Sequence, residues 1–234
     1  MTSLAWAIRI LVVIIALAAW GAFDGPAAAD PPAADAPETE PPTLDAVLAG
    51  MEKRYEGSGF SAQFDQESTV AAMDITDRAS GRLWVKSPGM MRWEYETPEP
   101  QVIVTNGKAL WVYRPVDNQV MVGSAPLMFD KGRGAGFLSD VSVIRDRFEV
   151  ALVPSDDPGY YHLGLVPRGE GFDITRIDLF VSRQTHDIHR IISRNAYGDE
   201  TRIYIGDYRF DLGLTDERFT FEIPEGADVV RLEE

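Results

Sequence analysis

The sequence predicts a mainly β protein, with one antiparallel sheet, a helix ahead of it and a helical insertion in the middle. From Phe60 onward, apolar and polar residues alternate with a period of two, in runs bounded by turn residues, which is typical of strands. Residues 43–57 follow a helical period instead, and residues 123–146 break the strand rhythm. A chain of 234 residues with 45% hydrophobic content suits one folded domain.

The N-terminus resembles a targeting segment rather than a part of the fold. Arg9 precedes an uncharged run over residues 10–23, and small residues follow at 27–29. This run is shorter than the roughly 18–20 residues of a membrane-spanning helix. We therefore predict a secretory signal peptide over residues 1–29, cleaved after Ala29, with an uncleaved anchor as the alternative. Residues 30–42 are rich in proline and acidic side chains and are predicted to form an extended linker, which leaves 43–234 as the folded domain.

The segment TLDAVLAGMEKRYEG predicts the N-terminal amphipathic helix. Thr43 is a suitable N-cap, and Asp45 lies in the first turn, where the helix dipole favours negative charge. Gly57 is expected to end the helix. Apolar residues recur at helical spacing and form one stripe that must pack on another element: Leu44, Val47, Leu48, Met51 and Tyr55.

Asn106-Gly107, between two apolar runs, predicts a hairpin with a two-residue turn. In that register Thr105 lies opposite Lys108, and Val104 lies opposite Ala109. One face of the hairpin is then more apolar than the other, and we expect it to point inward. This face carries Val102, Val104, Ala109, Trp111 and Tyr113.

The glycine-rich residues 131–136 separate two groups of apolar residues, which predicts one or two short helices in the insertion. These apolar residues are Leu127, Met128, Phe129, Phe137, Leu138 and Val141. Strand-like runs resume afterwards, which gives an antiparallel meander of roughly ten strands. Two interpretations remain open: an ordinary packed core, or a curved sheet whose inner face receives an apolar ligand under a helical cover.

Composition excludes several functional classes. The chain has no cysteine, which excludes disulfides, thiolate nucleophiles and a lipidated N-terminal cysteine. A net charge of −15 argues against nucleic acid and against an anionic membrane as partners. His186 and His189 flank Asp187 without an evident third metal ligand. We therefore expect no metal, no cofactor and no enzymatic activity; a hydrolase that uses these three residues is the alternative from another functional class.

Three blocks carry a resemblance to a known family. SGRLWVKSPGMMRWEYETPEPQVIVTNGKALWVYRPVDNQV, at 80–120, resembles the LolA family of periplasmic lipoprotein carriers, and FSAQFDQ (60–66) and RFTFEIPEGADVV (218–230) resemble its first strand and its closing block. The resemblance implies an unclosed antiparallel β-barrel, or half-barrel, with an α-helical lid over an apolar cavity for acyl chains. It also implies the periplasm as location, acylated lipoproteins as cargo, an inner-membrane lipoprotein exporter as donor and an outer-membrane acceptor. We expect a monomer.

The resemblance assigns roles to individual positions. Trp93 corresponds to the aromatic cavity strand of the family, and Met91 and Tyr95 share its face by period two. With the apolar face of the hairpin, the expected acyl cavity comprises Met91, Trp93, Tyr95, Val102, Val104, Trp111 and Tyr113. The expected lid comprises Leu48, Met51, Leu127, Phe129, Phe137 and Leu138. Ser87 replaces an arginine that helps to hold the lid closed in the family. Lid control or cargo therefore differs here, and the alternative is a carrier or sensor of another amphiphile, such as a glycolipid.

Overall fold

The computed structural model describes residues 42–57, 59–125, 136–169, 173–210 and 213–232, which all belong to one compact unit spanning Pro41–Glu234. The predicted signal peptide and most of the predicted linker lie outside the described residues, as does the central part of the insertion at 126–135. Among the described residues, no helix is both long enough and apolar enough to cross a membrane.

Within the described ranges, the strands form one twelve-stranded sheet with the order β12-β6-β5-β4-β3-β2-β1-β11-β10-β9-β8-β7. Neighbours are antiparallel except β12, which pairs with β6 in parallel. The sheet is therefore an open one with β7 and β12 at its edges, and it has more strands than the roughly ten that the sequence predicts. The strands are β1 (Phe60–Val70), β2 (Ile75–Lys86), β3 (Met90–Thr97), β4 (Gln101–Asn106), β5 (Ala109–Arg114), β6 (Gln119–Ser124), β7 (Phe148–Val153), β8 (Tyr160–Pro167), β9 (Ile174–Ser182), β10 (Ile188–Asn195), β11 (Glu200–Phe210) and β12 (Asp228–Arg231).

Helix α1 (Leu44–Tyr55) lies where the sequence predicts a helix. The Thr43 hydroxyl accepts a hydrogen bond from the Ala46 backbone N–H at 3.2 Å, as an N-cap does. Four side chains of the predicted stripe are buried: Val47, Leu48, Met51 and Tyr55. The other helical pieces among the described residues are short: η1 (Ala71–Met73), η2 (Pro115–Asp117), η3 (Gly136–Ser139), α3 (Val143–Arg147) and η4 (Asp216–Phe219).

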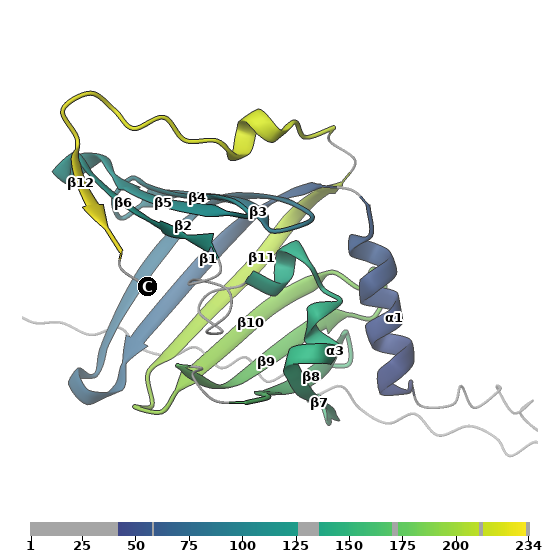
Figure 1. Cartoon of the computed structure of the whole chain (residues 1–234). Helices are drawn as coiled ribbons and strands as arrows, with labels where there is room; N and C mark the ends of the chain where they lie inside the picture. Colours follow the sequence, from purple (N-terminus) through teal and green to yellow (C-terminus); the bar gives the residue numbers. More distant parts are fainter. Residues whose placement is uncertain (1–41, 58, 126–135, 170–172, 211–212, 233–234) are drawn as a thin grey trace, which may run out of the picture. The chain divides into compact units, whose positions relative to one another are not determined.

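The main hydrophobic core lies on the inner face of the sheet, between the strands and the α1, η3 and α3 helices (Figure 1). Alternate residues of each strand point into it, as Phe60, Ala62 and Phe64 do from β1. Phe137 and Leu138 of η3 and Ile144 of α3 are buried in the same cluster. The inner face is thus packed solid beside the helices.

A second apolar layer covers the outer face of β3 to β6. The C-terminal segment, residues 213–232, runs across these strands and ends as β12 beside β6 (Figure 1). Phe219 of this segment is fully buried, and the Phe221 ring lies 5.5 Å from the Tyr113 ring. Val104 and Val120, on the same outer face, have no exposed surface. Both faces of this half of the sheet are therefore apolar and covered.

The predicted hairpin exists between β4 and β5, but its register differs from the prediction. Thr105 pairs with Leu110 rather than with Lys108, so four residues, 106–109, lie between the last paired residues. The Asn106 side-chain oxygen accepts hydrogen bonds from the backbone N–H groups of Lys108 and Ala109, at 3.0 and 2.9 Å. These side-chain bonds build a wider Asx-type turn in place of the two-residue turn.

The predicted inward face of this hairpin is wrong. Trp93 pairs with Ile103, whereas Val104 pairs with Arg92 and Trp111. Because paired residues share a face, Ile103 points inward with Trp93, and Val104 points outward. The same alternation places Val102, Trp111 and Tyr113 outward. Their apolar character is explained by the C-terminal segment that covers them, not by the inner face.

Candidate functional site

The inner face is hollow at the end away from α1. A cavity of about 340 Å³ lies between β3 and β4 on one side and β9, β10 and β11 on the other. These two groups of strands are not neighbours in the sheet, so the curvature of the sheet brings them to face each other across β1 and β2. The lining residues are Gln66, Met91, Trp93, Tyr95, Ile103, Thr105, Asp173, Ile174, Ile177, Ile191, Ser193, Arg194, Asn195, Asp199, Thr201 and Ile203.

One part of the cavity is apolar. The Phe64 ring lies behind it and meets the rings of Trp93 and Tyr95 edge to face, at centroid distances of 4.8 and 4.9 Å. Such pairs fix the orientation of the aromatic wall. The opposite wall is aliphatic, with buried Ile177 and Ile191. Burial also raises the pKa of Tyr95 to about 12, so this side chain stays neutral at physiological pH.

The other end of the cavity is polar. The Tyr95 hydroxyl donates to the Gln66 side-chain oxygen at 3.0 Å. In the turn between β10 and β11, the Asn195 amide donates to Asp199 at 2.9 Å, and the Asn195 oxygen accepts the Asp199 backbone N–H at 2.9 Å. The cavity therefore has an apolar interior and a polar rim, an arrangement suited to an amphiphile.

The structure brings together three of the predicted cavity residues, namely Met91, Trp93 and Tyr95. Val102, Val104, Trp111 and Tyr113 do not line the cavity, because the strand pairing turns these side chains to the outer face. Sequence reasoning missed Ile103 and Thr105 on that strand, and it missed the opposite wall of isoleucines. The alternation of Ile177 with Arg176 and Asp178 is a signal for that wall, because it marks one apolar face of β9.

The predicted lid residues fall into two groups. Leu127 and Phe129 lie outside the described residues. Leu48, Met51, Phe137 and Leu138 are buried in the core beside the cavity and do not line it. Ser87 is exposed at the end of β2 and lines a separate hollow between α1 and η3, where its hydroxyl makes no hydrogen bond to any described residue.

Helix α1 is tied to the sheet by polar contacts at its C-terminal end. Arg54 donates to both carboxylate oxygens of Asp187, at 2.6 and 3.3 Å. The Tyr55 hydroxyl accepts the Ile188 backbone N–H at 2.9 Å, and the Tyr208 hydroxyl donates to the Ile188 carbonyl oxygen at 2.7 Å. Burial raises the pKa of the Tyr55 hydroxyl, so it stays protonated. These contacts fix α1 on the turn between β9 and β10.

His186, Asp187 and His189, the residues of the alternative hydrolase hypothesis, make structural contacts. Asp187 is engaged by Arg54, and the His189 ring stacks on Tyr160 at a centroid distance of 4.8 Å. The His186 ring packs so closely on α1 that a Cβ at Gly50 would clash with it. The described residues contain no group of three or more His, Cys, Asp and Glu side chains that is arranged to hold a metal ion.

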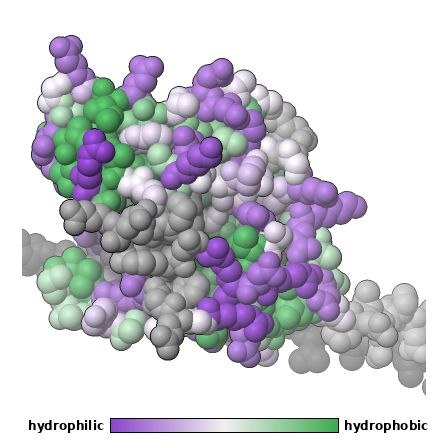
Figure 2. Space-filling view, viewed as in Figure 1, coloured by the Kyte–Doolittle hydropathy of each residue, from purple (hydrophilic) through white to green (hydrophobic). Residues whose placement is uncertain are grey.

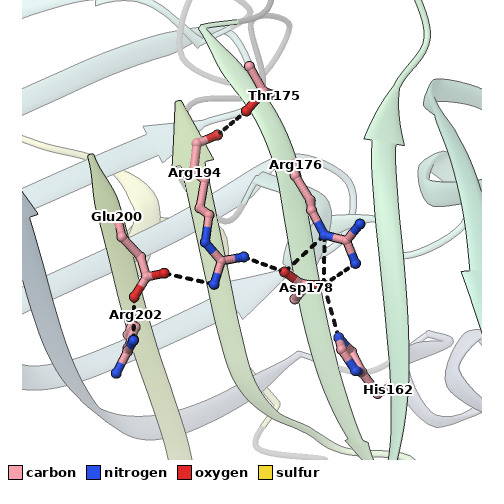
Figure 3. Close-up of polar contacts among 7 residues, drawn as sticks. All are labelled: His162, Thr175, Arg176, Asp178, Arg194, Glu200 and Arg202. Carbon is pink, nitrogen blue, oxygen red and sulfur yellow. Dashed lines mark hydrogen bonds and ion pairs between the residues drawn. The ribbon is translucent and has the colours of Figure 1, made fainter. Parts of the chain in front are cut away.

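The outer face of β8 to β11 carries a polar network centred on Asp178, whose side chain is only 6% exposed (Figure 3). Asp178 accepts hydrogen bonds from Arg176 at 2.7 Å and Arg194 at 2.6 Å, and His162 Nε2 lies 2.9 Å from the same carboxylate. Burial alone would raise the pKa of Asp178, but the three donors outweigh it and hold the pKa at about 2. Arg194 continues the network to Glu200, which also pairs with Arg202. This network binds four strands together, and through Arg194 it also reaches the lining of the cavity.

The inner face of this open sheet thus carries an apolar cavity with a polar rim, beside a packed core. Residues 56–222 match the family model described as outer membrane lipoprotein carrier protein LolA. The match covers most of the chain, so the chain belongs to the LolA family.

Individual relatives agree with this assignment. The chain is 27% identical over 187 residues to the outer-membrane lipoprotein carrier protein of Hahella chejuensis, a match that covers 79% of this chain and 87% of that protein. It is 28% identical over 188 residues to the protein of the same name from Alkalilimnicola ehrlichii, covering 79% and 84% of the two chains.

A solved structure shares the fold. The crystal structure of an uncharacterized conserved protein from Thermus thermophilus superposes with a TM-score of 0.52 at 16% identity, over 80% of this chain and 98% of that one. The expected family is thus confirmed, and the open half-barrel is consistent with the observed sheet.

Proposed function

We propose that this protein is a periplasmic carrier that binds the acyl chains of lipoproteins in the cavity between β3–β4 and β9–β11 and delivers them from the inner to the outer membrane. The observation that carries the proposal is the apolar cavity itself, lined on both sides by side chains such as Trp93 and Ile191. The names of the relatives support lipoproteins as cargo.

The energetics of the cavity fit a carrier. An acyl chain in water is unfavourable by about 0.8 kcal/mol for each CH₂ group, and an apolar cavity removes that penalty without directional bonds. Cargo proteins with different sequences but the same lipid are therefore bound alike. We expect the polar rim around Asn195 and Asp199 to lie where the lipid joins the attached protein. Binding and release of an acyl chain make and break no covalent bond, so the proposed role is not enzymatic.

The lid and its control belong to this proposal. The expected cover combines the insertion, including Leu127, Phe129 and the η3 residues Phe137 and Leu138, with α1. Because Arg54 and Tyr55 fix α1 to the sheet, we assign Leu48 and Met51 to a static wall of this cover. Exposed Ser87 lines a hollow together with Leu138 and supplies one hydroxyl where the family resemblance implies a guanidinium, so lid control or cargo differs here.

Site-specific photo-crosslinking tests the proposal. A photoreactive amino acid at position 93 should cross-link to acylated lipoproteins in the periplasm, because Trp93 lines the cavity. The same substitution at position 84 is the matched control, since Trp84 pairs with Arg92 on the outer face. Lipoproteins whose acylated cysteine is replaced by serine should not cross-link at either position. Equal cross-linking at 84 and 93, or none at 93, would exclude this cavity as the lipoprotein site.

A second candidate function is a carrier or sensor of another amphiphile, such as a glycolipid. Its support is Ser87 in place of the family's arginine, together with the hydroxyl and amide groups on the cavity rim. Mass spectrometry of the lipid that co-purifies with the chain separates the two candidates. Lipoproteins as the sole ligand would eliminate the glycolipid.

A further inference from the structure

The tip of the β1–β2 hairpin exposes apolar side chains into solvent. Met73 is 63% exposed and Ile75 49% exposed, and Ala71 and Ala72 beside them are exposed as well. Figure 2 shows the hydrophobic residues of this hairpin gathered on the surface at the lower left. The tip is a projecting turn, in which η1 connects the paired residues Val70 and Ile75.

A second turn lies against this tip and enlarges the apolar surface. The Ala71 backbone N–H donates to Asp199 at 3.0 Å, and a Cβ at Gly198 would lie 3.6 Å from the Ala71 side chain. Tyr197, next to Gly198, is 86% exposed. The tips of two hairpins that are adjacent in the sheet, β1–β2 and β10–β11, therefore present Met73, Ile75 and Tyr197 at the same end.

This end of the protein is also the polar end of the cavity. Asp199 lines the cavity and is the same residue that holds Ala71. A shallow hollow of about 570 Å³ shares Gln66 and Tyr95 with the cavity and continues to Ser68 and Asp77, which pair with each other two residues before the tip. The hollow ends beside Val116, which is 65% exposed at the β5–β6 turn. The cavity and this hollow, which share Gln66 and Tyr95, thus follow one another towards the exposed apolar tips.

We infer that this end of the protein docks on a lipid bilayer, with Met73, Ile75 and Tyr197 inserted at the level of the headgroups. The inference rests on the proposed carrier function, because it supplies the place where acyl chains pass between cavity and membrane without crossing water. Aromatic and aliphatic side chains on projecting turns suit the interface of a bilayer.

The charges around the tip indicate which kind of membrane surface this end of the protein can bind. Asp74 and Asp77 are the charged residues closest to the tip in sequence, and the nearest basic side chain, Arg78, is paired with Glu67 at 2.9 Å. The whole chain carries a net charge of −15. An anionic surface would repel this end, so the surface it fits is zwitterionic.

Vesicle co-sedimentation tests the inference, with the chain purified from the periplasm and phosphatidylcholine vesicles as probe. The double variant Met73→Ser, Ile75→Thr should partition on the order of tenfold more weakly than the unaltered chain, since it removes two inserted apolar side chains. Ile223→Thr is the matched control, because Ile223 is 44% exposed on the C-terminal segment, and it should bind vesicles as the unaltered chain does.

The outcomes separate this inference from the proposed function. Binding of a fluorescent fatty acid should be equal in all three proteins, since the tip residues do not line the cavity. Fatty-acid binding without any vesicle binding overturns the docking surface alone, whereas loss of both overturns the carrier as well. Equal vesicle binding by all three proteins, or stronger binding to vesicles that contain phosphatidylglycerol, also overturns the inference. So would a tip variant that loses lipoprotein delivery in cells but keeps full vesicle binding, because the tip would then contact a protein.

Discussion

Replacing Ile103 by asparagine tests whether the inner face of β4 contributes to ligand binding. Ile103 is half-buried on the inner face of β4 and lines the cavity. Its neighbour Val102 is also half-buried but points outward, because it pairs with Glu94 and Tyr113 on the other face. Val102→Asn is therefore a matched control that introduces the same amide in the same strand, one residue away.

The expected loss of affinity for a fatty acid follows from two terms. Full burial of an isoleucine side chain is worth about 1.5–3 kcal/mol, and a ligand covers roughly half of Ile103, which gives about 1 kcal/mol. An amide placed against an acyl chain without a hydrogen-bond partner costs a further ~1–3 kcal/mol. Together these terms give about 2–4 kcal/mol, or a dissociation constant raised between about 30-fold and several hundred-fold.

Titration with a fluorescent fatty acid, at a temperature well below the unfolding transition of each variant, measures this loss. Ile103→Asn should bind in the weakened range, and Val102→Asn should bind within about twofold of the unaltered chain, since a residue outside the cavity contributes little to binding. Equal losses in both variants, or a loss confined to Val102→Asn, would refute the assignment of the inner face.

Three further predictions concern the framework that holds the cavity. Tyr55→Phe leaves the buried Ile188 N–H without its acceptor, so urea unfolding should show a loss of about 1–3 kcal/mol; an unchanged midpoint would contradict the role of this bond. The folded-state pKa of Asp178 is about 2, below its ordinary 3.8, so its stabilisation is complete above the ordinary value and is lost as pH falls towards 2. Asp178→Asn should therefore be less stable than the unaltered chain at pH 7 and should lose less stability between pH 7 and pH 2. Parallel curves of unfolding free energy against pH for the two proteins would contradict this effect of Asp178. A Cβ at Gly81 would clash with the Glu94 carbonyl oxygen, so Gly81→Ala should lower stability by about 1–3 kcal/mol or more in a thermal melt; an unaltered melt would mean that β2 and β3 do not approach as described.

The sequence predicted those elements that depend on interactions between residues close together in the chain. Helix α1 follows from a stripe at helical spacing and a threonine cap, and both features act within a few residues. The β4–β5 hairpin follows from Asn106-Gly107 in the same way. Its register did not, because the Asn106 side chain bonds to two backbone N–H groups and widens the turn, a competition that the dipeptide alone does not reveal.

The inward face of β4 was not predictable from its apolar character, because both faces of this strand are covered. Val104 is buried under a segment that contains Phe219, far along the chain, and this contact leaves no signal near Val104. The cavity itself depends on curvature that brings β4 opposite β9 and β10. The sequence indicated the strands on both walls, but it held no information on which of them would face each other.

The position of a bound acyl chain tests most directly whether this cavity is the lipid site. A crystal structure with a fatty acid that carries bromine at its terminal carbon locates the chain end by anomalous scattering. We expect bromine between Ile103 and Ile191, inside the cavity. Bromine in the hollow between α1 and Ser87, or on the outer face beneath the C-terminal segment, would contradict it.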